Sequence, residues 1–313
     1  MTPAMPIRTI LGAAALACAA TCAPAGAADG APFDVAVTVD DLSVHGPLPR
    51  GLSWDGIARA YIDTLRAHHV PQAWGFVNAK RLQEQPASSA VLDDWRRVGW
   101  PLGNHTYSHL GLSQAPSLHA WIDDARAGEP VLAARMGKAD WHVLRFPFLD
   151  GGDEVPRHDG AITWLNAQGY RIAEVSISFD DWAYTDTYAR CLDKGDAAAI
   201  ARMKADYLRR VDAAIVRTRA LSQRVYGRMI PQVLLTHLGA WSAATLPDVM
   251  ARLDAAGARY VTLEQAQNDA AYRAPSPRVG NGMLMERHAQ DLRIDVAGLP
   301  APAPVMALEN VCR

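Results

Sequence analysis

Short β-rich runs alternate with helical patterns along most of the chain, and this alternation restricts the fold more than any other feature of the sequence. The β-rich runs lie at residues 35–39, 73–77, 142–146, 171–178, 232–236 and 259–262. The main helical patterns between them lie at residues 57–66, 91–98, 118–136, 162–168, 197–221 and 246–255. Strands and helices that alternate at this spacing form a parallel sheet with its helices outside. The runs VAVTV and QVLLT are continuously apolar, as in strands buried on both faces, and we therefore expect an α/β barrel.

Length and composition agree with one globular domain and a tail. The chain has 313 residues, of which 50% are hydrophobic and 20% charged, so it can bury a core. Its 31 basic and 33 acidic side chains give a net charge of -2. This balance argues against a sequence-independent nucleic-acid binder, which needs an excess of Lys and Arg. We expect the domain to cover residues 29–270, and the Pro/Gly-rich residues 271–313 to form an irregular tail on its surface.

The N-terminus has the pattern of a secretory signal peptide over residues 1–28. Arg8 supplies the positive charge, residues 10–20 form a short apolar run, and Ala25-Gly26-Ala27 is a cleavage site of the A-x-A type. The apolar run is short for a bilayer span, so an uncleaved anchor is the weaker reading. We expect an exported protein, periplasmic or secreted, with no stable membrane insertion after cleavage; nothing in the sequence fixes its oligomeric state.

Export changes the reading of the cysteines. Cys18 and Cys22 leave with the signal peptide, whereas Cys191 and Cys312 remain in an oxidising compartment. Two outcomes stay open, a disulfide that ties the tail to the domain or two unpaired thiols, and the separation of the two Cα atoms decides between them.

Polar residues gather where the predicted strands end. Asp40 and Asp41 end the first run, Arg145 lies near the end of the third, and His237 follows QVLLT. Chemistry in α/β barrels takes place at the carboxyl ends of the strands. Each residue also has an ordinary explanation: a solvated turn carboxylate, a surface ion pair or a core histidine. Because the strand ends of a barrel converge, we expect these residues to line one pocket.

His105 and His109 have the spacing of metal ligands. If the segment is helical, residues four apart lie on one face, so both imidazoles would meet one ion. Thr106 occupies the place of the glutamate that a zincin needs, which argues against that protease class. Asp41 is the natural third ligand, and two histidines with one aspartate hold Zn²⁺, or another divalent transition metal, with positions left open. The alternative is two surface histidines at chance spacing.

The neighbouring residues supply an acid and a base. Asp40 is the candidate general base, and Arg145 is expected to keep it ionised through a bidentate contact. His237 is the candidate proton donor, since histidine titrates near neutral pH. Trp182 is either a core residue or the apolar wall of a pocket. Other histidines, among them His45 and His68, have no motif around them and are treated as incidental.

In their order along the chain, these motifs resemble the polysaccharide deacetylase family, also called the NodB-homology domain or carbohydrate esterase family 4. The resemblance covers about residues 34–268. The motifs are Thr38-Val39-Asp40-Asp41 for TFDD, His105-Thr106-Tyr107-Ser108-His109 for H-S/T-x-x-H, Arg145-Phe146-Pro147 for R-x-P, Ser178-Phe179-Asp180-Asp181-Trp182 for D-x-x-D-W, and Leu234-Leu235-Thr236-His237 for a leucine-rich strand ending in His.

The resemblance implies a fold and a set of roles. The fold would be a distorted, incomplete (β/α) barrel. Asp41, His105 and His109 would bind a metal, usually zinc. Asp40 would act as the base that Arg145 orients, and His237 would protonate the leaving amine. Substrate contacts would come from the third and fourth motifs, with the backbone N–H of Phe148 at the oxyanion; these residues are Pro147, Phe148, Asp181 and Trp182.

The fourth motif departs from the family pattern. Ser178 stands where the resemblance places an aspartate that tunes the acidic histidine. Either Asp180 substitutes for it or the acid is tuned differently, so the departure bears on His237 more than on the reaction class.

The implied function is that of an exported metal-dependent hydrolase that removes N-acetyl groups from amino-sugar polysaccharides such as peptidoglycan, chitin-like or glucosamine polymers. Its partner would be an acetylated glycan, with no nucleic acid. Three alternatives stay open: an O-acetyl esterase acting on xylan, a catalytically impaired glycan-binding protein, and an iron oxygenase with two histidines and one carboxylate. The oxygenase requires a double-stranded β-helix, which the strand-helix alternation does not fit.

Overall fold

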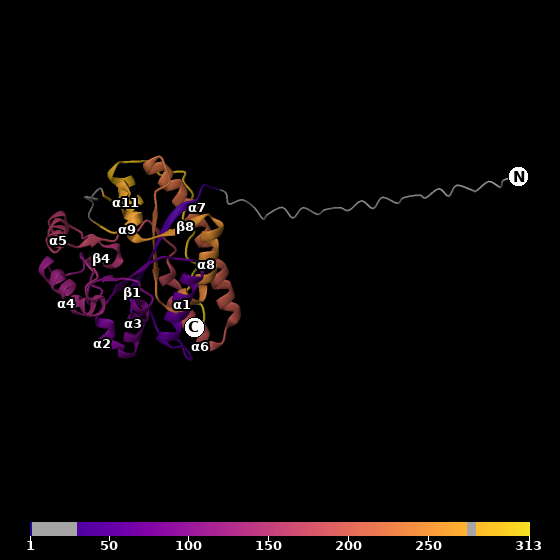
Figure 1. The fold of residues 1–313 in the computed structure, drawn as a ribbon, viewed down its shortest axis with the longest axis horizontal. Coiled ribbons are helices and arrows are strands. Elements are labelled where there is room, and N and C mark those ends of the chain that lie inside the picture. Colours follow the sequence, from indigo (N-terminus) through magenta and orange to yellow (C-terminus); the bar gives the residue numbers. More distant parts are fainter. Residues whose placement is uncertain (2–29, 274–279) are drawn as a thin grey trace.

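The computed structural model describes residue 1 and residues 30–273 and 280–313. The predicted signal peptide lies almost wholly outside these residues. Figure 1 shows helices arranged around a central strand, β1 (Phe33–Leu42). The other strands are β2 (Ala73–Val77), β3 (Leu102–Asn104), β4 (Val143–Leu144), β5 (Arg171–Ile172), β6 (Ile177–Ser178), β7 (Gln232–His237) and β8 (Ala258–Val261). The longer helices are α1 (Trp54–Ala67), α3 (Ser89–Arg97), α4 (Leu118–Met136), α5 (Val155–Ala167), α6 (Thr185–Lys194), α7 (Ala197–Tyr226) and α8 (Ala240–Ala255).

All the strand pairs within the described sheet are parallel, in the order β5-β4-β3-β2-β1-β7-β6. The eighth strand, β8, pairs with the first half of β1. Both β1 and β7 are buried along almost their whole length, as their apolar sequences predicted. The parallel α/β architecture is therefore confirmed, and it brings the carboxyl ends of β1, β2, β3 and β7 to one edge.

The predicted single strand at residues 171–178 is wrong, because its two ends pair with opposite edges of the sheet. β5 pairs with β4 and the backbone N–H of Ala173 still bonds to β4, whereas the N–H of Ser176 already bonds to Val233 of β7. Three residue steps span at most about 11 Å of extended chain. The sheet must therefore curl until its edges nearly meet, which gives the expected distorted (β/α) barrel.

Two further features differ from the sequence-based expectation. β3 has only three residues, one of them glycine, and so left no recognisable β-rich run. The tail is not wholly irregular, because Leu284–Asp291 forms helix α11, whose Leu284 and Met285 pack against Leu221 of α7. The remaining α-helices of the described chain are short: α2 (Lys80–Glu84), α9 (Leu263–Gln267) and α10 (Ala270–Arg273). Three 3-10 helices complete it: η1 (Pro86–Ser88), η2 (Pro147–Leu149) and η3 (Asp181–Tyr184).

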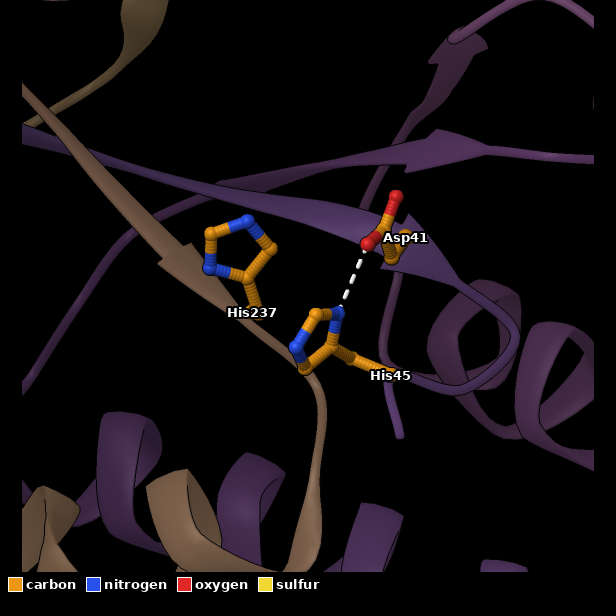
Figure 2. Close-up of side chains that lie close together, drawn as sticks. All are labelled: Asp41, His45 and His237. Atoms are coloured by element: carbon orange, nitrogen blue, oxygen red, sulfur yellow. Dashed lines mark hydrogen bonds and ion pairs between the residues drawn. The ribbon is translucent and has the colours of Figure 1, made fainter. Parts of the chain in front are cut away.

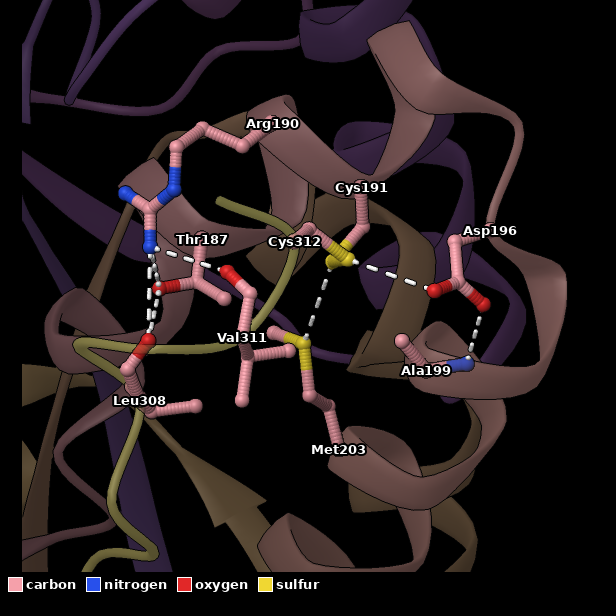
Figure 3. The surroundings of a disulfide bond; sticks show 9 residues. All are labelled: Thr187, Arg190, Cys191, Asp196, Ala199, Met203, Leu308, Val311 and Cys312. Atoms are coloured by element: carbon pink, nitrogen blue, oxygen red, sulfur yellow. Dashed lines mark hydrogen bonds between the residues drawn. A yellow bond between two sulfur atoms is a disulfide. The ribbon is translucent and has the colours of Figure 1, made fainter.

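A disulfide ties the C-terminus to the domain. Cys191 of α6 and Cys312 are bonded, with their Cα atoms 5.1 Å apart, so the structure has the paired outcome of the two left open (Figure 3). Arg190 donates hydrogen bonds to the carbonyl oxygens of Leu308 and Val311, which fixes the same segment beside the bridge. Across the described part of the chain, no helix is both long and apolar enough to cross a membrane.

Candidate active site

The end of β1 presents two adjacent carboxylates to one site. Neighbouring residues of a regular strand point to opposite faces, but Asp41 has a φ of 58° and the pairing with β2 shifts between Val39 and Leu42. This irregularity turns both side chains the same way. The Nε2 atom of His105 consequently lies 3.6 Å from an oxygen of Asp40 and 3.6 Å from an oxygen of Asp41.

The two motif histidines meet through a loop, and the expectation of a helical turn is wrong. His105 follows β3 directly, and both Thr106 and His109 have positive φ angles, of 57° and 62°. The side chain of Asn104 accepts from the N–H of Thr106, whose hydroxyl in turn accepts from the N–H of Leu110. These bonds fold the loop so that the imidazole centroids of His105 and His109 lie 4.9 Å apart.

Asp41, His105 and His109 form a set of atoms that fits a divalent metal. The Oδ1 atom of Asp41 lies 3.4 Å from His109 Nε2 and 3.6 Å from His105 Nε2, and it is buried without a hydrogen-bond partner. His105 Nδ1 lies 2.8 Å from the carbonyl oxygen of Arg145, which can only accept, so Nδ1 carries the proton. The Nε2 lone pair therefore faces Asp41, as a metal ligand requires.

The charge states of these groups suit the same role. Burial opposes the ionised form of Asp41, but the hydrogen bond from His45 and the nearby imidazoles outweigh it and hold its pKa well below the usual range. Burial, reinforced by His105, lowers the pKa of His109 to about 4. At neutral pH the site thus offers a carboxylate and a neutral imidazole to a cation.

Arg145 is buried beside Asp40, with about 1% of the residue exposed. Its Nη1 lies 3.1 and 3.2 Å from the two carboxylate oxygens of Asp40, so one nitrogen serves both instead of the expected two-nitrogen fork. The remaining nitrogens are used elsewhere: Nη2 donates to Thr38 and Nε to the carbonyl oxygen of Ala173. The guanidinium therefore connects Asp40 to Ala173, in the segment where the chain passes from one edge of the sheet to the other.

His237 ends β7 and pairs in register with Asp40 on β1. Its Nδ1 lies 2.8 Å from Asp181 Oδ1, while Asp181 Oδ2 accepts from the backbone N–H of His237 and from the hydroxyl of Ser242. Burial disfavours the imidazolium, but the charge and hydrogen bond of Asp181, together with the charges of Asp41 and Asp40, outweigh it and raise the pKa of His237 to about 9. His237 is accordingly protonated at neutral pH.

The structure corrects the reading of the fourth motif. Asp181 is about 1% exposed and bonds to His237, the candidate acid, so it has little surface for the substrate contact that the sequence suggested. Asp180 forms an ion pair with Arg210 of α7 and does not substitute for an acid-tuning residue. Ser178 accepts from the N–H of Asp180. The departure at Ser178 therefore removes nothing from the environment of His237.

Two aromatic side chains are exposed at the site. Phe148 and Trp182 are 51% and 53% exposed, which fits the predicted substrate contacts. The ring of Phe148 lies 4.4 Å from that of His109, centroid to centroid, and Phe148 has a φ of 59°. Pro147 is buried and begins the short turn that presents Phe148, so it shapes the site without facing a ligand.

His45 also belongs to the site, although the sequence offered only an Asp-x-x-x-His spacing to suggest it. Its Nδ1 lies 2.7 Å from Asp41 Oδ2, and its ring centroid lies 4.7 Å from that of His237 (Figure 2). Asp41 therefore stands between two groups of imidazoles, with His105 and His109 near one oxygen and His45 at the other.

Comparison with known proteins agrees with the motif order. Residues 28–173 match the family described as Polysaccharide deacetylase. No curated protein matches the chain. Among solved structures, the peptidoglycan deacetylase PdaC from Bacillus subtilis is 19% identical, with 84% of this chain and 96% of that chain covered and a TM-score of 0.49.

Two further structures are similar at the same level. A family 4 carbohydrate esterase from Streptomyces lividans is 16% identical, with 77% of this chain and 97% of that chain covered and a TM-score of 0.48. A mutant of BA3943 from Bacillus anthracis, a CE4 family pseudoenzyme with restored activity, is 15% identical, with 75% and 67% covered and a TM-score of 0.49. The family match shows a polysaccharide deacetylase domain over residues 28–173, and two further motifs that resemble those of this hydrolase family follow in order beyond residue 173.

Proposed function

We propose that the chain is an exported, divalent-metal-dependent hydrolase that removes N-acetyl groups from amino-sugar polysaccharides. The observation that supports this most directly is the placement of a three-residue metal set between a base and an acid. Asp40 pairs with Arg145 on one side, and His237 pairs with Asp181 on the other. Hydrolysis of an amide needs both a proton acceptor for water and a proton donor for the leaving nitrogen.

Asp41, His105 and His109 would hold the cation, for which we propose zinc, because two imidazoles and one carboxylate are typical ligands of a catalytic zinc. When bound, such a cation lowers the pKa of water and polarises a carbonyl oxygen. The buried, unpartnered Oδ1 of Asp41 and the fixed tautomer of His105 are the observations that favour a metal here.

The side chains of the protein would carry the proton transfers. Asp40 takes a proton from the attacking water while the water oxygen bonds to the acetyl carbon. Arg145 keeps Asp40 ionised and oriented, and the backbone N–H of Phe148 donates to the developing oxyanion. His237, protonated and held by Asp181, gives its proton from Nε2 to the nitrogen as the C–N bond breaks, which yields acetate and a free amine.

The exposed rings of Phe148 and Trp182 favour a sugar polymer as the substrate, because aromatic faces offer apolar surface beside polar catalytic groups. The glycan-binding alternative loses its motivation, since Asp181 supplies the acid environment that Ser178 seemed to lack. The parallel sheet also disagrees with the oxygenase alternative.

Acetate release from defined substrates tests the proposal. The purified chain with added Zn²⁺ is incubated with N-acetylated chitooligosaccharides, peptidoglycan and O-acetylated xylan, with an Asp40→Asn variant as control. We expect zinc-dependent acetate release from an N-acetylated glycan and its loss in the variant. Release from xylan alone would establish the esterase alternative, and release from none of the substrates would overturn the assignment.

A further inference from the structure

His45 lies at the metal set but outside every motif that identified the site. It follows β1 by three residues, and about 20% of its side chain is exposed. Its Nδ1 lies 2.7 Å from Asp41 Oδ2 (Figure 2). Because the ionised carboxylate can only accept, His45 Nδ1 carries the proton and donates it.

This hydrogen bond determines which oxygen of Asp41 is free. With Oδ2 held by His45, Oδ1 alone remains for His105 and His109, and it is the oxygen that has no hydrogen-bond partner. Without the bond, the carboxylate would be free to rotate about its terminal torsion, where the preference for any one angle is weak. His45 thus limits Asp41 to one orientation toward the two imidazoles.

The backbone holds His45 firmly in this place. Its N–H donates to the carbonyl oxygen of Leu238 at 2.7 Å. A Cβ atom on Gly239 would lie 2.8 Å from the carbonyl oxygen of His45, so the close approach of these two segments requires glycine. Two residues earlier, Ser43 shares a buried hydrogen bond of 2.5 Å with Ser88. The loop that carries His45 is therefore anchored to the strand end that carries His237.

We propose that His45 is a positioning residue that orients Asp41 for metal binding. The inference rests on the proposed metal site and adds to it a residue that makes no contact with the metal. Partners that orient a ligand in this way typically contribute 10- to 100-fold to metal affinity. The proposal also explains why a polar side chain occupies a tightly packed loop beside the candidate acid.

Zinc affinity of three variants tests the proposal without any use of catalytic activity. The affinity is measured by competition with a chromophoric chelator, on the full chain and on His45→Leu, His45→Asn and His45→Gln. An asparagine amide nitrogen coincides with the position of Nδ1, whereas a glutamine amide nitrogen reaches the position of Nε2. We expect zinc to bind about 10- to 100-fold more weakly to the leucine and glutamine variants. The asparagine variant should retain most of the wild-type affinity.

A matched histidine provides the control. His68 donates to Asp254 at 2.6 Å, and it lies just before β2, at the opposite end of the strands from the site. His68→Leu should leave zinc affinity unchanged. Thermal melting of each variant shows whether the fold is intact.

The possible failures are distinguishable. Equal affinity in wild type and all three variants would overturn the positioning role. Rescue by glutamine but not by asparagine, or two zinc ions per chain with one lost in the leucine variant, would make His45 a ligand through Nε2 and also overturn it. A wild-type chain that binds no zinc would instead refute the proposed metal site itself.

Discussion

Replacing Asp181 with asparagine tests the claim that this carboxylate keeps His237 in its acidic form. The pKa of His237 is raised from its ordinary 6.5 to about 9, against the opposing effect of burial. At about 1.4 kcal/mol for each pKa unit, the site favours the imidazolium by about 3 kcal/mol. Removing the carboxylate charge leaves burial opposed only by the weaker attraction of Asp41 and Asp40, so the pKa should fall well below 9. A smaller share of the imidazole would then be protonated at neutral pH.

The hydrogen bonds of Asp181 make the loss larger than the charge alone predicts. Its Oδ2 accepts from two donors, the N–H of His237 and the hydroxyl of Ser242. Asparagine has a single acceptor oxygen. With this oxygen at the Oδ2 position, bonded to these two donors, its NH₂ group would face His237 Nδ1 and the N–H of Trp182. The imidazole would then accept at Nδ1, and its neutral Nε2–H is a poor acid. We expect acetate release at pH 7 to fall by about 10²- to 10⁴-fold, the usual contribution of a general acid.

The assay is the pH dependence of kcat/KM for acetate release between pH 6 and 10. A bound cation disfavours the imidazolium in both proteins, so the decisive quantity is the difference between their alkaline limbs. We expect the limb of Asp181→Asn to lie at clearly lower pH than that of wild type. Ser242→Ala keeps the carboxylate and should shift the limb only slightly. An unchanged limb in Asp181→Asn would refute the reasoning.

The same shift has a consequence for stability. Because the folded-state pKa of His237 is raised, its stabilising contribution is complete below pH 6.5 and is lost as the pH rises through about 9. Wild-type protein without metal should therefore become less stable to urea across this interval. Asp181→Asn should show a smaller loss over this interval, and an equal loss in both proteins would contradict the assignment.

Four further changes test separate parts of the structure. Asp40→Asn should cut acetate release by about 10²- to 10⁴-fold but leave zinc affinity nearly unchanged; a large loss of zinc would make Asp40 a ligand. Arg145→Met leaves the buried Asp40 without its cation, and urea denaturation should show a loss of about 3–5 kcal/mol. Trp182→Ala should raise KM with little change in kcat, whereas a fall in kcat alone would contradict a binding role. Cys312→Ser opens the bond to Cys191, 121 residues away, and should lower the free energy of unfolding by about 2–4 kcal/mol without loss of activity.

The sequence was most informative where topology alone brings residues together. In a parallel sheet the carboxyl ends of neighbouring strands share one edge, so the positions of Asp40 and His237 after apolar runs sufficed to place them side by side. Their separation of nearly 200 residues was no obstacle, because the register of β1 and β7 fixes the contact. The same reasoning failed at residues 171–178. This run is continuously β-rich, so nothing in it indicates that its two ends pair with different strands.

Local geometry was harder to predict than residue identity. His105 and His109 were found through a spacing that assumed a helix, yet they meet because a loop with two positive φ angles returns the chain. The loop is held by hydrogen bonds from its N–H groups to the side chains of Asn104 and of Asp124 in α4, and neither partner is visible in the spacing. The motif indicated the correct residues for an incorrect structural reason.

The three buried aspartates of the site differ in their partners, and this difference decides what each can do. Asp40 faces a guanidinium, which stays charged at every relevant pH, so it is available to accept a proton. Asp41 faces imidazoles that can be neutral, so its charge is left for a cation. Asp181 bonds to both the ring and the backbone N–H of His237, and it raises the pKa of that imidazole more than Asp41 or Asp40 does.

Adjacent residues such as Asp40 and Asp41 are identical in side-chain chemistry, and no property of either residue alone separates a base from a ligand. The separation comes from Arg145 and His45, which lie 105 and 4 residues from their respective aspartates. It follows that exchanging a partner should change the role of an aspartate more than it changes the fold. This is why His45, which lies outside every motif, is expected to affect the proposed metal site through the orientation of Asp41.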